Sequence, residues 1–339
     1  MALDSEFKTI PEFHYFLDSS LSKPNNAPVI VMPMFLNCAP EEIANIASGR
    51  KISGSANFLS EDIFSFKIGL RKRSAIGYLV NYDSYWCGFL IPGERDNTET
   101  EVASRWMQDM FPIVTPAYVT SRQMLDLVQD LGIVEKSKTI LLDYVARSAK
   151  EGETTKRWRS GEFSKEKVMK HARNDDSLVD AMRIDFSSPN FSSRFKVNRR
   201  GLLVVYEGSF SEIHRLLISK LVVQAKSNLT RMSDKKRAME NGEMIVDTLR
   251  IRPEVNLTNS DMKQLKEALS RHYMTAVLYG GNPWLLVSLL DKSDGSALDL
   301  QAYQDEIIIT PVTRVSSASL TRLYSVLEEV LPSSLLQIV

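Results

Sequence analysis

The chain is poor in the residues that build metal centres and disulfide frameworks. Its 339 residues include two cysteines and four histidines. Two cysteines, Cys38 and Cys87, are too few for a disulfide framework, and neither has a second Cys or a His at the spacing of a zinc site. We expect both to be small core residues, because free cysteine is among the most buried residue types. We therefore assign no metal-binding residues and no cofactor.

Long apolar runs are also absent. The longest, residues 29–36, is interrupted by Pro33 and is far too short to span a bilayer. The first residues lack the basic start and the apolar stretch of a signal peptide. These features predict a cytoplasmic protein with no membrane partner.

The glycine-rich and histidine-rich motifs of common enzymes are missing. The chain contains no G-x-x-x-x-G-K-[ST], G-x-G-x-x-G or G-x-S-x-G sequence, so phosphate cradling and an elbow-type serine nucleophile have no support. A lone histidine is more often structural than catalytic, whatever its pKa permits. The four histidines are far apart in sequence and form no H-x-x-x-H pair, so we assign no catalytic residues. They are His14, His171, His214 and His272.

The last sixty-five residues do show a clear pattern, in which apolar runs alternate with turn signals. Strand-like runs cover residues 274–279, 284–290, 297–303 and 307–309, and an amphipathic helical pattern covers 316–331. Glycines and a proline at 280–283 favour a chain reversal before Trp284. The pattern predicts a three-stranded antiparallel meander followed by a packing helix, with Trp284 in the core.

The first part of the chain alternates helical and strand patterns. We expect strands at residues 29–35, 58–70, 74–81, 84–91 and 202–206. Helical patterns cover residues 7–21, 40–49, 98–110, 121–131, 137–149 and 211–241, with Ser121 as an N-cap.

Together these patterns predict an α+β protein of two domains, each a small antiparallel sheet packed with helices. The first domain is expected over residues 1–146, where hydrophobic density is high. Residues 147–200 are expected to form a basic connector, and residues 201–339 a second domain with a long basic-faced helix and the meander.

Charge is segregated along the chain although the formal net charge is zero. Residues 147–237 contain 21 Lys and Arg against 11 Asp and Glu, whereas the remaining residues contain 21 basic and 31 acidic side chains. Such segregation can steer one face toward an anionic partner, although solvated helical faces produce the same composition.

A noncatalytic nucleic-acid-binding accessory protein is the function that this charge pattern favours. Cations would contact phosphates while Trp158 stacks on a base. Trp158 could equally anchor the segment against a domain. The candidate nucleic-acid-binding residues are Lys156, Arg157, Trp158, Arg159, Lys165, Lys167, Lys170, Arg199, Arg200, Lys235, Lys236 and Arg237.

Two alternatives remain open at this point. A metal-dependent nuclease would use Glu207, Gln224 and Lys226, provided that the last two lie at the end of a strand. The helical period of residues 210–232 argues against that geometry, because it separates Gln224 and Lys226 by about 200°. A protein-interaction scaffold, with another protein subunit as partner, would use the segregated charges without a preference for phosphate.

Overall fold

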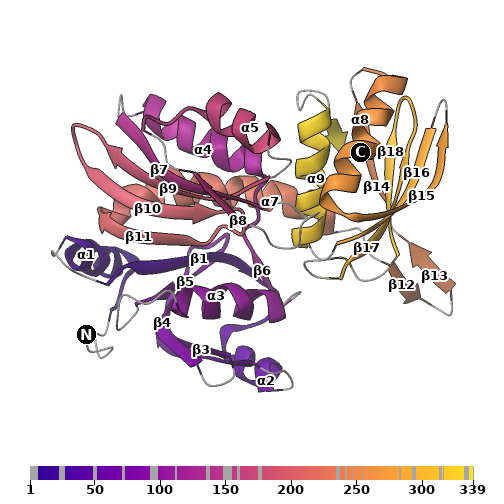
Figure 1. Cartoon of the computed structure of the whole chain (residues 1–339). Coiled ribbons are helices and arrows are strands. Elements are labelled where there is room, and N and C mark those ends of the chain that lie inside the picture. The colour runs from indigo at the N-terminus through magenta and orange to yellow at the C-terminus, as the bar shows by residue number, and fades with distance from the viewer. Residues whose placement is uncertain are drawn as a thin grey trace.

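The fold is known from a computed structural model, which shows an α+β protein with two main antiparallel sheets (Figure 1). It describes residues 7–22, 27–48, 52–70, 73–91, 98–110, 113–134, 138–147, 155–158, 161–174, 178–233, 237–240, 243–246, 248–253, 255–281, 284–291, 295–312, 315, 317–331 and 336–338. Within these residues no helix is both long and apolar enough to span a membrane.

The first sheet contains eleven strands in the order β2-β3-β4-β5-β1-β11-β10-β9-β7-β8, with β6 paired to β1. Every pairing in it is antiparallel. Its strands are β1 (Val29–Leu36), β2 (Ile52–Ser60), β3 (Ile63–Leu70), β4 (Arg73–Asn81), β5 (Trp86–Leu90), β6 (Val114–Pro116), β7 (Lys138–Arg147), β8 (Thr155–Trp158), β9 (Leu178–Ser187), β10 (Ser192–Asn198) and β11 (Leu203–Gly208).

Helices cover both faces of this sheet and create two apolar cores. On one face lie α1 (Ile10–Leu21), α4 (Ser121–Val134), α6 (Phe210–Ile213) and α7 (Ser219–Ser233), which bury residues such as Phe13 and Phe210. On the other face, a short 3₁₀ turn (Pro40–Glu42), α2 (Ile43–Ser48) and α3 (Thr98–Asp109) pack around Trp106. The helix α5 (Lys165–Asn174) packs against α4 and β9.

The second main sheet has six strands in the order β15-β16-β17-β18-β14-β19. Its elements are β14 (Leu249–Pro253), α8 (Asn259–His272), β15 (Met274–Gly281), β16 (Trp284–Leu290), β17 (Ala297–Ala302), β18 (Ile307–Pro311), α9 (Ser317–Val330) and β19 (Leu336–Ile338). A separate ribbon joins β12 (Arg237–Glu240) to β13 (Glu243–Val246). Helices α8 and α9 bury the apolar side of this sheet and form a second unit with it. α9 also contacts α4 and α7 of the first unit, which consists of the first sheet and its helices (Figure 1).

The C-terminal prediction is confirmed: the expected meander corresponds to β16, β17 and β18, and α9 follows it. Trp284 differs from the expectation, because it is only partly buried and stacks on Tyr303 with ring centroids 6.0 Å apart. Of the two cysteines, Cys87 is buried and Cys38 is partly exposed.

The arrangement of strands differs from the expected domain division. Residues expected as a connector over 147–200 include β8, β9 and β10, which add to the first sheet, as does β11. The first sheet is therefore larger than expected. In the described residues, the last element of the first unit is α7, which ends at Ser233.

Three expectations about individual elements and one about a helix cap were wrong. The helix expected at 137–149 is the strand β7, and the strand expected at 58–70 is the end of β2, a turn and β3. The helix expected at 211–241, long or slightly broken, contains a π-helical segment, His214–Ile218, but it ends at Ser233, and β12 begins at Arg237. The N-cap of α4 is Thr120, whose hydroxyl accepts from Gln123 N while Gln123 Oε1 accepts from Thr120 N.

Candidate functional site

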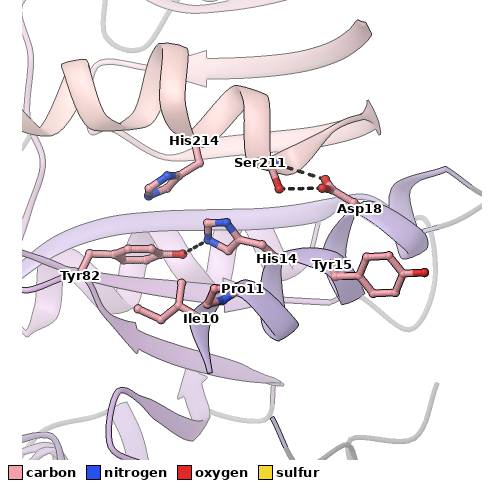
Figure 2. Close-up of a pocket in the computed structure, with 8 residues that line it drawn as sticks. All are labelled: Ile10, Pro11, His14, Tyr15, Asp18, Tyr82, Ser211 and His214. Atoms are coloured by element: carbon pink, nitrogen blue, oxygen red, sulfur yellow. Dashed lines mark hydrogen bonds between the residues drawn. The ribbon is translucent and has the colours of Figure 1, made fainter. Parts of the chain in front are cut away.

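An open hollow of about 480 Å³ lies where α1 meets α6. Figure 2 shows side chains from three distant parts of the chain converging on it: α1, the turn between β4 and β5, and the helix that follows β11. The hollow is lined by Ile10, Pro11, His14, Tyr15, Asp18, Tyr82, Ser211 and His214.

Local chain geometry positions the wall that carries His214. Gly208 ends β11 with φ +113°, and a Cβ there would lie 2.4 Å from the carbonyl oxygen of Ser192, so a side chain does not fit. Ser209 then caps α6, because its side chain accepts from Glu212 N. The chain continues directly into the π-helical segment that begins at His214, and such segments are frequent at functional sites.

Asp18 fastens α1 to the start of α6. Its carboxylate accepts from the backbone N–H groups of Phe210 and Ser211 and from the Ser211 hydroxyl, the last at 2.7 Å. A carboxylate at a helix N-terminus satisfies unpaired N–H donors. The opposite wall comes from the tight turn after β4, in which Asp83 adopts a φ of 56°.

Two histidine–tyrosine pairs form the polar centre of this region. His14 Nε2 lies 2.6 Å from the Tyr82 hydroxyl, and His214 Nε2 lies 2.7 Å from the Tyr85 hydroxyl. The rings also pack together: His14 and His214 have centroids 5.0 Å apart, and Tyr82 stacks on His214 at 4.6 Å. The Nε2 atom of each imidazole is therefore already hydrogen-bonded within the protein.

Burial sets the ionisation of all four groups. It lowers the pKa of His214 to about 4, with a further contribution from His14. It also lowers the pKa of His14, although the Asp18 carboxylate opposes this effect. The pKa values of Tyr82 and Tyr85 are raised by the same burial. At neutral pH the cluster is thus a set of uncharged hydrogen-bonding groups.

This arrangement does not match a nucleophilic triad. The Ser211 hydroxyl donates to Asp18, and the Nε2 atoms of both imidazoles are engaged by tyrosines. Among the described residues, no three His, Cys, Asp or Glu side chains converge as metal ligands. The geometry can hold a ligand through hydrogen bonds and ring contacts.

Several of the candidate nucleic-acid-binding residues already have partners within the protein. Lys165 forms an ion pair with Asp126, and Arg199 is buried beside Asp180 with Nη2–Oδ1 at 3.3 Å. Arg200 donates to the Ser104 hydroxyl at 2.6 Å. Lys167 and Lys170 are exposed on α5.

The remaining candidates lie on strands or outside the described residues. Lys156, Arg157 and Trp158 belong to β8 at the edge of the first sheet, and Arg237 begins β12. Arg159, Lys235 and Lys236 lie outside the described residues.

Acidic partners offset the charge of several basic side chains in residues 147–237. The face of β9, β10 and β7 carries alternating charges, with Arg183 paired to Asp143 and Arg194 paired to Asp185. Arg215 similarly pairs with Glu212. The positive charge of these side chains is therefore balanced locally.

The nuclease geometry is absent. Gln224 and Lys226 lie on the helix α7 and not at a strand end. Glu207 is exposed on β11 and pairs with Arg194 at 3.2 Å.

Sequence reasoning missed the histidine–tyrosine cluster because its members come from distant segments. No local spacing links His14, Tyr82 and His214.

Comparison with known proteins adds no functional assignment: no protein-family model matches the chain, and no curated protein sequence matches it.

Proposed function

We propose that this chain is a noncatalytic binding protein that holds an uncharged planar heterocycle in the hollow between α1 and α6. The observation that carries the proposal is the convergence of His14, Tyr82 and His214 on one open hollow, with each imidazole uncharged and hydrogen-bonded to a tyrosine. Perturbed titratable groups that meet in a concave site are characteristic of functional sites.

The lining determines the chemistry of the ligand. Among the described residues that line the hollow, there is no lysine or arginine, and the one carboxyl side chain, that of Asp18, caps α6. An anionic ligand would thus meet no cation there. A heterocycle would pack on Ile10 and the ring of Tyr82, and would hydrogen bond with the imidazole Nδ1 atoms.

The expected affinity is weak for a small fragment. A heterocycle of about ten heavy atoms that gains roughly 0.4 kcal/mol per atom would bind with a dissociation constant of about 1 mM. Adenine and uracil are suitable probes, and inorganic phosphate is the anionic comparison. The imidazole resonances of His14 and His214 should shift on titration with a heterocycle, whereas those of His272, buried in the second unit, should stay unchanged.

A variant distinguishes binding in the hollow from binding elsewhere. Tyr82→Phe keeps the ring but removes the hydroxyl that fixes His14, so heterocycle affinity should fall several-fold. Tyr303→Phe, which removes a hydroxyl from the second sheet, is the matched control and should bind as the parent does. No shift of either imidazole with any heterocycle, or larger shifts with phosphate, would refute the proposal.

Nucleic-acid binding through residues 147–237 is a second candidate. It is favoured by the exposure of Lys167 and Lys170 on one helix. Replacing both by Ala should flatten the dependence of log affinity on log salt for an oligonucleotide, because fewer counterions are released. Lys165→Ala is the control, since Lys165 already pairs with Asp126. An unchanged slope in the double variant would remove α5 from the binding surface.

A further inference from the structure

The edge strand β15 of the second sheet presents an apolar, uncharged surface. It occupies one end of the strand order, and its eight residues include no charged side chain and no proline. Met274 is 52% exposed and Leu278 is 61% exposed. Leu290 of β16, directly opposite Met274, is 39% exposed and extends the apolar surface inward.

Such an edge is unusual in a soluble protein, because unpaired backbone groups beside apolar side chains favour pairing with another strand. Edges are normally protected by charged residues, by proline or by bulges. β15 has a bulge between Val277 and Tyr279, which leaves residues 274–277 in regular pairing with β16. Residues 274–277 of β15 therefore form a regular, mostly apolar strand. Among the described residues, no other strand pairs with its outer edge.

The edges of the first sheet differ from this pattern. β8 includes Lys156 and Arg157, and charges of this kind protect an edge. β2 includes polar residues such as Ser53 and Asn57, and its exposed Phe58 lies at a bulge. β15 is thus the edge with the longest uncharged apolar stretch among these three.

We propose that β15 pairs antiparallel with β15 of a second copy of this chain, joining the two six-stranded sheets across a two-fold axis. An identical strand meets no like charge here, because β15 carries none, and its apolar residues meet apolar residues. A charged peptide would find no complementary charge on the strand. Two-fold dimers are also the commonest symmetric assembly.

Sedimentation of the full chain across the micromolar concentration range tests the proposal. The parent should shift from monomer to dimer with rising concentration, and Leu278→Lys should remain monomeric. Leu278 is the extra residue of the bulge and largely exposed, so lysine there should leave the melting temperature unchanged. In the parent dimer, the amides of residues 274–277 should exchange more slowly than in Leu278→Lys.

Two further variants separate this edge from other apolar surfaces. Val223→Lys on α7 replaces a side chain that is 68% exposed and should leave dimerisation intact. Phe58→Lys on β2 should also leave it intact. A parent that stays monomeric throughout, or a dimer that survives Leu278→Lys, would overturn the proposal, and loss of that dimer in Phe58→Lys would place the contact at β2 instead. Failure here would leave heterocycle binding unaffected, because the hollow lies in the first unit.

Discussion

His14 and His214 meet edge to face, with ring centroids 5.0 Å apart, although one lies on α1 and the other begins the π-helical segment. Protonating either ring would place a charge in an aromatic environment beside the other. The pair therefore favours the neutral form of both rings. This property can be measured without knowledge of the ligand.

The first prediction concerns the titration of these rings. Burial lowers the pKa of His214 to about 4, so its imidazole should remain neutral from pH 8 to about pH 5. Nitrogen chemical shifts of the labelled imidazoles report the protonation directly. An ordinary titration midpoint near pH 6.5 would show that His214 is more exposed to water than the structure indicates.

The second prediction follows from Glu328 on α9, at the contact between the two units. Its carboxyl is hydrogen-bonded by the Thr120 side chain at the start of α4, near Arg122, Asp126 and Lys165. Burial raises the pKa of Glu328 to about 7 from an ordinary value of 4.5. Between these values the folded state holds a proton that the unfolded chain has lost. Stability should thus fall as pH rises through this window, by on the order of 3 kcal/mol.

Glu328→Gln tests this effect, because the amide keeps the shape and stays neutral. At pH 8 the variant should have a higher free energy of unfolding than the parent, and near pH 4.5 the two should converge. Glu12→Gln on the exposed face of α1 is the control. A difference that does not depend on pH would contradict the prediction.

The third prediction is that Glu328→Gln makes the opposite effect of His214 on the pH dependence of stability measurable. The unfolded chain binds a proton at His214 between pH 6.5 and about 4 that the folded protein does not, so stability falls as pH falls through that window. In the parent, Glu328 opposes this trend across much of the same range. Chemical unfolding of Glu328→Gln should therefore show a steeper loss of stability on acidification than the parent. Parallel pH profiles would rule out opposing contributions.

The fourth prediction concerns Asp18. Asp18→Ala removes the acceptor for Phe210 N, Ser211 N and the Ser211 hydroxyl, and should lower the free energy of unfolding by about 1–2 kcal/mol. It should also weaken heterocycle binding, because Asp18 holds together α1 and α6, which both line the hollow. Urea unfolding measures the first effect. A change within about 0.5 kcal/mol, which is typical of surface positions, would exclude the capping role.

The sequence predicted correctly those elements in which the spacing of apolar residues fits either a strand or a helix but not both. The strands β16 and β17 alternate buried and partly exposed residues, and α9 presents one apolar face. β7 was mistaken for a helix because a bulge after Leu141 interrupts its alternation, so that the buried residues Leu141 and Tyr144 lie three positions apart, as on a helical face. The candidate site was not predictable from periodicity, because tertiary packing alone brings His14 beside His214 and Tyr82.

The last prediction compares two tryptophans that the sequence could not distinguish. Trp106 is fully buried, donates from Nε1 to Ser53 O at 2.9 Å and packs edge-on against Phe66. Trp106→Ala should lower the free energy of unfolding by about 3–5 kcal/mol, because it leaves a cavity and an unpaired carbonyl. Trp284 is partly exposed, so Trp284→Ala should cost about 1–2 kcal/mol, mainly from its contact with Tyr303. Urea unfolding of both variants tests the order, and a larger loss for Trp284→Ala would mean that Trp284, and not Trp106, occupies a core.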